Sequence, residues 1–409
     1  MKIWIKKSQE EIKKHVFKAL NENVNYNTQN VLGIPSSYLD DEIFSQDESF
    51  LKEAPYMSSL VKNPNHIGCH TLGNSEGYFN GTQKIEKELI ELCAVDILKG
   101  KPLEQDGYVA SGGTEANIQA IWIYRNYFMH EFNAKLDEIC IICSEDSHYS
   151  MDKSSNLLSI SIYKISVDKE NRSISKESII TQIKNAQAIG KKYFIVVVNM
   201  MTTMFGSVDD IRLYVEALNE VSVIFKIHID GAFGGFYYPF SNENNELNFL
   251  NEYVSSITLD AHKMAQAPYG TGIFLIRKGF MKYVNTEQAS YIEGQDATLI
   301  GSRSGANAIS VWMILMKNGP FGWFEKIYIL QKRTRWLCKK LEDLSIGFYR
   351  FPGSNIVTIK SKFVSKELAK KFGLVPDNHL NPKWYKIVVM NHVSMEKLTL
   401  LINNIKLNM

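Results

Sequence analysis

Short apolar runs bounded by turn residues alternate with helix-length segments through most of this chain. The runs with the length of a strand are Tyr108 to Ala110, Glu138 to Cys143, Ser159 to Ile165, Tyr193 to Asn199, Val223 to Asp230, Ser256 to Leu259 and Gly272 to Arg277. After the first run, residues Glu115 to Phe128 carry apolar side chains at the spacing of one helix face. This alternation predicts βαβ units, and therefore an α/β fold with a mostly parallel central sheet flanked by helices.

The two ends of the chain follow different patterns. From about Pro320 a long, mixed-charge helical stretch, Trp323 to Leu344, leads into strand-like runs at Ile356 to Ile359 and Tyr385 to Met390. This pattern predicts a smaller C-terminal α+β domain over 316–409, after a large domain over 61–315. Residues 1–60 are polar and helix-prone, so we expect an N-terminal helical segment that wraps a partner subunit.

Charge and composition narrow the class of protein. The chain has 409 residues, with 46 Lys and Arg against 44 Asp and Glu, so its formal charge is only +2. A charge this small argues against nucleic acid and for a small-molecule partner. No signal-peptide pattern and no long apolar run occur, which predicts no membrane segment. The five cysteines are too few for a disulfide framework, so we expect a cytoplasmic protein.

One cysteine pair has the CxxC spacing that is found in zinc and redox sites. Cys140 and Cys143 lie inside an apolar run, and no second CxxC follows elsewhere in the chain. We therefore interpret the pair as part of a buried strand, and we expect no metal site.

A glycine-rich turn supplies the first candidate for ligand chemistry. The segment Ser111-Gly112-Gly113-Thr114 stands between a short apolar strand and a helix. Glycines let backbone N–H groups approach an anion, the hydroxyl groups add donors, and the helix presents its positive end. The turn therefore suits a phosphate, although a Gly-Gly turn also simply caps many helices. It matches neither a Walker P-loop nor a GxGxxG dinucleotide turn.

The second and third candidates follow two later strands. Asp230 stands at the carboxyl end of an apolar strand, where open α/β sheets bind ligands, and a carboxylate there keeps a pyridine nitrogen protonated. Lys263 follows the next strand, where its amine can form an imine with an aldehyde cofactor, and His262 can donate to a phosphate. His148 follows an earlier strand, and its imidazole can stack on a pyridine ring. Each signal also has a purely structural explanation, so the argument rests on their combination.

Together these stretches resemble the group II pyridoxal 5′-phosphate (PLP) dependent amino-acid decarboxylases of fold type I, the aspartate-aminotransferase fold. They are most similar to the archaeal-type tyrosine/aspartate decarboxylases. The matching motifs are Gly77-Tyr78-Phe79-Asn80-Gly81-Thr82, Ser111 to Asn117, Ser147-His148-Tyr149-Ser150, Asp230 to Gly235, Asp260 to Met264 and Gly301 to Ala306. The resemblance covers more than half of the chain and implies that the large domain binds PLP.

The resemblance implies a role for each matching residue. Lys263 would form the Schiff base with PLP, Asp230 would pair with the pyridinium nitrogen, and His148 would stack on the ring. The residues that would hold the phosphate or lie near the ring are Ser111, Gly112, Gly113, Thr114, Thr203, Ala232, His262 and Ser302. Ser302 would reach the phosphate from the second subunit of a homodimer.

Substrate contacts are also implied. Arg303 matches an anchor for the substrate carboxylate. In the stretch Asn63 to Thr71, His66 and His70 either line the side-chain pocket or simply cap the local structure. Tyr291 lies in a segment that resembles a mobile catalytic loop, and it or His148 would protonate the substrate carbon. Tyr283 is an alternative tyrosine nearby.

Two positions depart from the family pattern. Met201 stands where relatives usually have glycine, and Gly231 stands where they often have another small residue. Both affect the shape of the loops around the ring rather than a reacting group.

The resemblance implies an L-amino-acid decarboxylase that releases CO2 and a primary amine, with tyrosine, another aromatic amino acid or aspartate as substrate. A histidine decarboxylase, an aldehyde-forming deaminase and an aminotransferase remain alternatives within the same cofactor chemistry. A non-catalytic binding relative would have lost the lysine or the aspartate, and both Lys263 and Asp230 are present.

Overall fold

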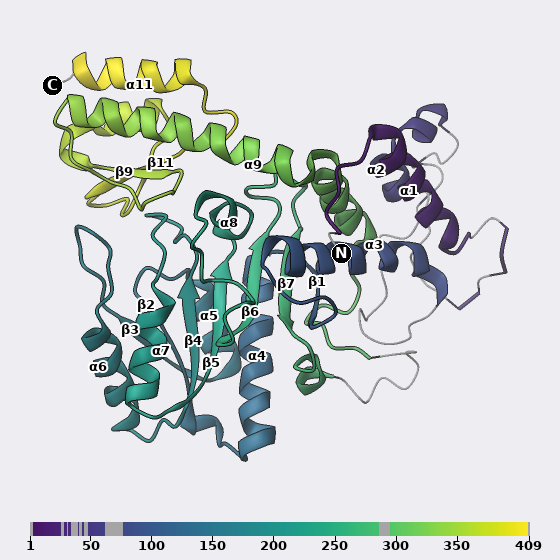
Figure 1. Cartoon of the computed structure of the whole chain (residues 1–409), viewed down its shortest axis with the longest axis horizontal. Coiled ribbons are helices and arrows are strands. Elements are labelled where there is room, and N and C mark those ends of the chain that lie inside the picture. The colour runs from purple at the N-terminus through teal and green to yellow at the C-terminus, as the bar shows by residue number, and fades with distance from the viewer. Residues whose placement is uncertain are drawn as a thin grey trace.

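A large α/β unit carries a smaller α+β unit at one end of the molecule (Figure 1). The computed structural model describes residues 3–25, 28–30, 32–33, 40, 43–44, 48–61, 77–285 and 295–407. Figure 1 shows the central sheet with helices on both of its faces and the C-terminal sheet above the large unit, beside α11.

The central sheet has seven strands in the order β1-β7-β6-β5-β4-β2-β3. Its strands are β1 (Gln105–Ala110), β2 (Ile139–Ser144), β3 (Ser161–Ile165), β4 (Tyr193–Asn199), β5 (Ile224–Gly231), β6 (Val254–Asp260) and β7 (Gly272–Arg277). All neighbouring pairs are parallel except those of β7, which runs antiparallel to both β1 and β6. The predicted mostly parallel sheet is confirmed, and each predicted strand matches an observed one to within a few residues.

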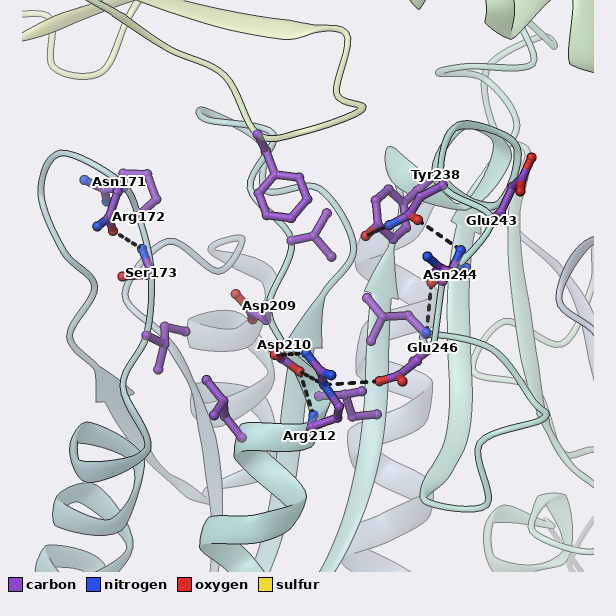
Figure 2. Close-up of a pocket in the computed structure, with 18 of the residues that line it drawn as sticks. Asn171, Arg172, Ser173, Asp209, Asp210, Arg212, Tyr238, Glu243, Asn244 and Glu246 are labelled. Atoms are coloured by element: carbon purple, nitrogen blue, oxygen red, sulfur yellow. Dashed lines mark hydrogen bonds and ion pairs between the residues drawn. The ribbon is translucent and has the colours of Figure 1, made fainter.

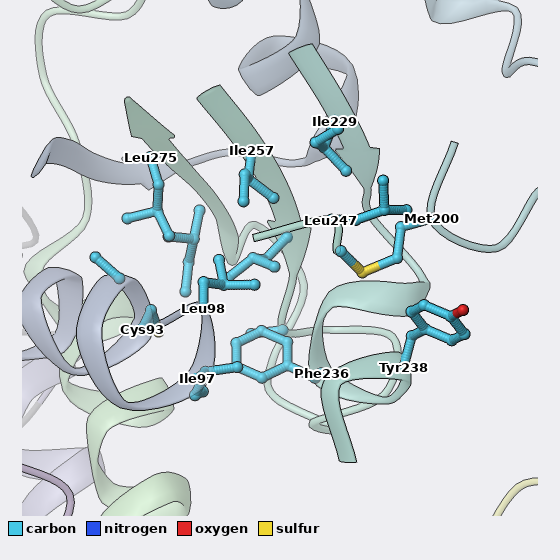
Figure 3. Close-up of a cluster of buried hydrophobic side chains, with 14 of the residues drawn as sticks. Cys93, Ile97, Leu98, Met200, Ile229, Phe236, Tyr238, Leu247, Ile257 and Leu275 are labelled. Carbon is cyan, nitrogen blue, oxygen red and sulfur yellow. The ribbon is translucent and has the colours of Figure 1, made fainter. Parts of the chain in front are cut away.

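Helices cover both faces of this sheet. They are α3 (Asn80–Leu92), α4 (Gly113–Phe132), α5 (Ser150–Leu158), α6 (Lys176–Gln187), α7 (Ile211–Glu220) and the short α8 (Tyr238–Ser241). Helix α4 packs on one face, in a core that includes Tyr108, Ile141 and Phe274. The larger core on the other face includes Met200, Ile229, Phe236 and Ile257, and Figure 3 shows these side chains packed beneath the strands.

The CxxC pair is part of this packing. Cys140 and Cys143 both lie on β2 and are fully buried. Because side chains alternate along a strand, the two thiols belong to cores on opposite faces of the sheet. Burial raises the pKa of each thiol to about 12. The interpretation as a buried strand is confirmed, and the two sulfur atoms are not placed to share one ligand.

A long helix joins the two units. Helix α9 (Gly305–Asp343) is kinked where Gly319 adopts a left-handed φ of 64°, and Pro320 follows directly. Sequence periodicity predicted only the part after the kink, because the first part is buried on several sides and lacks a polar stripe. The predicted domain boundary between residues 315 and 316 falls inside this helix, and its position stays a prediction.

The smaller unit contains the second sheet, with strand order β10-β11-β9-β8 and antiparallel pairing throughout. Its elements are β8 (Phe348–Tyr349), β9 (Ile356–Lys360), α10 (Lys366–Lys371), β10 (Val375–Pro376), β11 (Trp384–Val388) and α11 (Met395–Leu407). A separate core cluster unites this sheet with the end of α9 and with α11. The predicted smaller α+β unit is confirmed.

The N-terminal segment packs on its own chain. Helix α1 (Gln9–Glu22) contacts α3 and α9, and helix α2 (Pro55–Val61) contacts α1 and α9. Trp4, Ile12 and Val16 are buried in the main core. The predicted helical character is observed, whereas contact with a partner subunit stays a prediction. No helix in the described part of the chain is long and apolar enough to cross a membrane.

Short helical turns connect several of these elements. They are η1 (Ser49–Glu53), η2 (Gly77–Phe79), the π-helical η3 (Cys93–Ile97), η4 (Leu136–Glu138), η5 (Gly234–Phe236), η6 (Met281–Val284) and η7 (Ser361–Phe363).

A cleft of about 850 Å³ lies between the large unit and the smaller sheet. Figure 2 shows that Arg212 lies between Asp210 and Glu246 on its wall, with Tyr238 across the cleft. Its lining includes none of the predicted site residues that the structure describes. The chemistry predicted from the sequence is therefore located elsewhere, at the end of the central sheet.

Candidate active site

The predicted site residues converge because of the strand directions. Strands β1, β2, β4, β5 and β6 all end at the same edge of the sheet, and the antiparallel β7 begins there. The segments that follow these strands carry the glycine-rich turn, His148, Thr203, Ala232 and Lys263. This is the edge at which open α/β sheets bind ligands.

The glycine-rich turn touches the neighbouring strand ends. Helix α4 begins at Gly113, and a Cβ atom at that position would lie 2.8 Å from Asp260 Oδ2 and 3.0 Å from the Ala232 Cβ. A Cβ at Gly112 would lie 3.7 Å from His262 Cε1. Glycine is therefore required at residue 113, and the turn places the first N–H groups of α4 beside the strand ends that carry His262 and Ala232.

Glu115 stabilises this turn from within α4. Its Oε2 accepts a hydrogen bond from the Ser111 backbone N–H at 2.7 Å, and its Oε1 accepts one from the Tyr108 hydroxyl at 3.0 Å. The Ser111 side chain stays exposed, and Thr114 is half-buried. Both residues belong to the turn, and their hydroxyl groups would be donors to a phosphate bound there.

Lys263 lies in the loop between β6 and β7. Its Nζ is 2.9 Å from Asp260 Oδ2, and His262 Nε2 is 3.7 Å from the same oxygen. Sequence reasoning quoted Asp260 as part of a motif but gave it no role. Its position three residues before the lysine, at the end of a strand, was the available signal.

Two buried polar atoms at this point have no hydrogen-bond partner within the described residues, namely Asp260 Oδ1 and His262 Nδ1. Such atoms cost free energy unless a ligand or water satisfies them. The His262 ring stacks on Tyr269 with 4.8 Å between ring centroids, which fixes its direction. Burial lowers the pKa of His262.

Asp230 and His148 are connected through the side chains beneath them. Asp230 Oδ1 accepts from the Ala232 N–H at 3.1 Å, and its Oδ2 accepts from Asn117 Nδ2 at 3.0 Å. His148 Nδ1 accepts from the Ser150 N–H at 3.2 Å. Burial lowers the pKa of His148, an effect that the nearby charges of Asp230 and Asp260 oppose and that of Lys263 reinforces. His148 therefore lies close to the charges of both the lysine and the aspartate.

Next to these groups, the β4–α7 connection contains both Thr203 and Met201. Thr203 is exposed, and its carbonyl oxygen accepts from Lys386 Nζ at 3.0 Å. Lys386 belongs to the smaller unit, and burial together with the charge of Lys263 lowers its pKa. Sequence reasoning missed Lys386, because nothing in its local pattern indicates that β11 approaches the sheet edge.

Both departures from the family pattern have a structural counterpart. Met201 is buried and adopts a left-handed φ of 71°, a conformation that favours glycine. At Gly231, a Cβ atom would lie 2.9 Å from the Thr258 carbonyl oxygen, so the backbone leaves no room for a side chain.

Arg303 is buried against Glu86. Its Nη1 forms an ion pair with Glu86 Oε1, and its Nη2 lies 3.2 Å from Oε2. Its Nε is buried and has no partner within the described residues. Ser302 beside it is exposed. The structure thus shows Arg303 engaged within its own chain, with one N–H group still available.

The structure describes only one of the three residues Tyr291, His70 and Tyr283. Tyr291 and His70 lie outside the described residues, so their roles stay predictions. Tyr283 is described, and its hydroxyl donates to Glu131 at 2.7 Å. Glu131 stands near the end of α4, roughly 27 Å along the helix from Gly113 at 1.5 Å per residue. Tyr283 is therefore not at the site, and it is not an alternative to Tyr291.

The described residues fit PLP. An amine, a carboxylate and a neutral imidazole meet at one sheet edge, beside a glycine turn at a helix start and an unpartnered His262 nitrogen that is suited to a phosphate. Lys263 would hold the aldehyde carbon and Asp230 the ring nitrogen. Fold and site together define a fold type I PLP enzyme.

Comparison with known proteins gives the family. The model of the pyridoxal-dependent decarboxylase conserved domain matches residues 84–345. The chain is 51% identical over 408 residues to a tryptophan decarboxylase of Clostridium sporogenes, which covers 99% of this chain and 98% of that protein. This chain therefore belongs to the pyridoxal-dependent decarboxylases, enzymes that use PLP as cofactor.

More distant relatives agree with this assignment. A probable L-tyrosine/L-aspartate decarboxylase of Methanosarcina barkeri is 29% identical over 379 residues, which cover 87% of this chain and 92% of that protein. The solved L-methionine decarboxylase of Streptomyces sp. 590 superposes with a TM-score of 0.71 at 20% identity, over 97% of this chain and 93% of that chain. The resemblance to group II PLP decarboxylases is thus confirmed, as is the fold.

Proposed function

We propose that this enzyme decarboxylates an aromatic L-amino acid, with L-tryptophan as the first candidate and L-tyrosine as the second. The observation that carries the proposal is the 51% identity to a tryptophan decarboxylase over nearly the whole of both chains. Two archaeal relatives, both named as probable L-tyrosine/L-aspartate decarboxylases, are only 29% and 31% identical to this chain. This lower identity supports an aromatic substrate over aspartate.

When bound, PLP supplies an electron sink that stabilises the negative charge left on the substrate carbon after CO2 departs. The residues of this chain position that chemistry. Lys263 anchors the cofactor, and Asp230 keeps the ring nitrogen protonated. His148 covers the ring, and the turn at Ser111 to Thr114 holds the phosphate, with His262 as a further donor.

We assign the proton that returns to the substrate carbon to Tyr291, with His148 as the alternative. His148 Nδ1 accepts from a backbone N–H, so the ring proton of the neutral imidazole is on Nε2. An Nε2–H group is able to donate that proton.

Replacing Lys263 with Ala should abolish the visible absorbance of the lysine-bound cofactor.

Two cations are candidates for binding the substrate carboxylate. Arg303 offers only its Nε, because Glu86 engages its other nitrogens. Lys386 has no acidic partner within the described residues, and its ammonium is close enough to Lys263 to be affected by its charge. We propose Arg303 as the fixed anchor and Lys386 as a second contact from the smaller unit.

Kinetics with substituted enzymes test this assignment. Lys386→Met should raise KM about tenfold, since one charge-assisted hydrogen bond is lost, and should leave the cofactor spectrum unchanged. Arg303→Gln should lower thermal stability as well, because it leaves the buried Glu86 unpaired. Lys332→Met, which changes an exposed lysine of α9, is the control. An unchanged KM for Lys386→Met would remove that residue from the substrate site.

The substrate itself is tested by measuring CO2 and amine from each common L-amino acid. We expect the highest kcat/KM with L-tryptophan or L-tyrosine, and equal yields of CO2 and amine. A preference for aspartate or histidine would overturn the aromatic assignment. Formation of an aldehyde, or a requirement for a keto acid, would instead indicate the deaminase or aminotransferase alternatives.

We further propose that the enzyme is a cytoplasmic homodimer with shared active sites. The buried Cys93, Cys140, Cys143 and Cys338 are all unpaired, which supports a reducing compartment. Ser302 is exposed although it stands next to buried Arg303, which supports a contact with a second subunit.

A further inference from the structure

A continuous chain of buried hydrogen bonds runs beneath the site, from one face of the sheet to Asp230. It links Tyr124 Oη to Ser256 Oγ at 2.5 Å, Ser256 Oγ to His228 Nδ1 at 2.7 Å and His228 Nε2 to Asn117 Oδ1 at 2.9 Å. Asn117 Nδ2 then reaches Asp230 Oδ2 at 3.0 Å. None of the three central residues, Asn117, His228 and Ser256, is more than 1% exposed.

The donor and acceptor of every hydrogen bond in this buried series follow from the charge of Asp230. A carboxylate only accepts, so the amide nitrogen of Asn117 must face it and the amide oxygen must face His228. His228 therefore carries its proton on Nε2. Burial lowers the pKa of His228 to about 4, so the ring is neutral and its Nδ1 accepts from Ser256. Thr258 Oγ1 lies 3.3 Å from the same Nε2 and shares its proton.

A second branch leaves Asn117 toward His148. The other amide hydrogen of Asn117 points to Ser150 Oγ at 3.0 Å, so that this oxygen accepts. The Ser150 hydroxyl is then free to donate to His148 Nδ1 at 2.9 Å, beside the backbone N–H of Ser150. Both donors face Nδ1, which leaves the ring proton of His148 on Nε2.

Asn117 is the branch point of the two paths, and its amide donates both of its N–H groups and accepts one bond. We propose that Asn117 is a positioning residue that couples Asp230 to the orientation of His148 through the Ser150 hydroxyl. The two groups proposed to contact opposite parts of the cofactor ring are thereby set by one amide. This proposal rests on the roles of Asp230 and His148 given above.

The coupling has a direct consequence for the cofactor. Without the amide, Asp230 Oδ2 loses its described donor, so the carboxylate is no longer held in one orientation. A carboxylate that turns away would stabilise the protonated ring nitrogen of PLP less. A ring with less positive charge lets the nitrogen bonded to Lys263 keep its proton to higher pH, so the visible absorbance should change at a higher pH than in the wild type.

Asn117→Leu tests the proposal, because leucine has nearly the shape of asparagine and makes no hydrogen bond. We expect the dissociation constant of PLP to rise at least about tenfold and the pH midpoint of the visible band to move upward. Both measurements are made without substrate, so they stand apart from the substrate screen. Should this variant fail to fold, Asn117→Ser leaves space for water and is expected to show the same shifts.

His228 provides the rescue comparison. His228→Gln keeps an N–H group near the position of Nε2, so it should retain most of the wild-type affinity for PLP and the wild-type pH midpoint. His228→Leu removes the donor and should resemble Asn117→Leu. Ser150→Ala isolates the second branch, and combining it with Asn117→Leu should add no further loss, because both changes break the same path.

Asn248→Leu is the matched control. Asn248 is as buried as Asn117 and also donates and accepts through its amide, but it does so within the loop before β6. The Asn248→Leu substitution should lower the melting temperature without changing the PLP dissociation constant or the pH midpoint of the visible band. The proposal is overturned if Asn117→Leu behaves like Asn248→Leu, or if the effects of Ser150→Ala and Asn117→Leu are additive.

Discussion

Single residues in this protein carry opposing energetic terms, and Met201 shows how the balance is decided. Its left-handed φ of 71° costs about 1 kcal/mol, whereas burial of its side chain contributes about 2 kcal/mol. We therefore expect Met201→Gly to lower the melting temperature, although glycine removes the strain. Leu103, with a φ of 63° and an exposed side chain, is the control. Leu103→Gly should leave the melting temperature unchanged or raise it, and a stabilising Met201→Gly would contradict this balance.

His228 makes stability depend on pH. Its pKa falls from an ordinary 6.5 to about 4 because it is fully buried. Between these values the unfolded chain binds a proton that the folded chain does not, so the stabilising contribution is present above pH 6.5 and is lost as the pH falls toward 4. The full loss is about 3 kcal/mol.

Urea unfolding of the wild type and of His228→Gln, at pH 7 and at pH 5, measures this effect. The free energy of unfolding should change less between pH 7 and pH 5 in His228→Gln than in the wild type. His130→Gln changes an exposed side chain, so it should keep the wild-type difference. Equal differences in all three proteins would show that His228 is not the group responsible.

At the scale of elements, the kink of α9 depends on one glycine. A Cβ atom at Gly319 would lie 2.6 Å from the Lys6 Cβ and 3.0 Å from its Cα, and the φ of 64° already disfavours other residues. Gly319→Ala should therefore destabilise the protein by at least about 2 kcal/mol. Gly322, one turn later, has only the Asn318 Cβ at 3.9 Å. Gly322→Ala should stabilise by about 0.5 to 1 kcal/mol, since alanine favours the helix.

Denaturant midpoints of the two variants, measured side by side, decide this prediction. The same substitution three residues apart should give shifts of opposite sign. Shifts of the same sign would mean that the contact with Lys6 does not hold the kink.

Elements with a strong local pattern were predictable from the sequence, and those that depend on distant contacts were not. The run Tyr193 to Asn199 coincides with β4, because a strand buried on both faces is a continuous apolar segment. The two-residue strands β8 and β10 carry too few side chains to produce a pattern. The π-helical turn at Cys93–Ile97 also lacks a distinct signal.

The same distinction holds for the candidate site. Lys263, Asp230 and the glycine-rich turn were predictable because each stands at or just after the end of a recognisable strand. Asn117 was visible only as part of a motif, since its partners His228 and Asp230 lie more than 100 residues away in the sequence. Directed networks of this kind are set by packing rather than by local pattern.

For the whole molecule, the predicted shared site is open to a complementation experiment. If Ser302 completes the site of the partner subunit, then a chain with Lys263→Ala still supplies Ser302, and a chain with Ser302→Glu still supplies Lys263. Each variant alone should be inactive or nearly so, and mixing them with subunit exchange should restore activity in one site of each mixed dimer. The wild type should also sediment at twice 46.7 kDa.

The control is a mixture of Lys263→Ala with Asp230→Ala. Both of these residues are proposed to contact the same cofactor molecule from the same chain. Each mixed dimer then carries one changed residue at each site, so no activity should return. Failure of the first mixture, in dimers shown to have exchanged, would place Ser302 in the site of its own chain.

The edge position of β1 also has a consequence for the order in which the protein forms on the ribosome. Within the central sheet, β1 hydrogen-bonds only to β7, whose sequence begins about 160 residues after β1 ends. At roughly 5 to 20 residues per second, the strand that leads into the glycine-rich turn waits on the order of 10 to 30 seconds for its partner. The parallel strands β2, β4 and β5 emerge during that interval. The cofactor-binding edge therefore closes late in synthesis, after most of the sheet that supports it has been made.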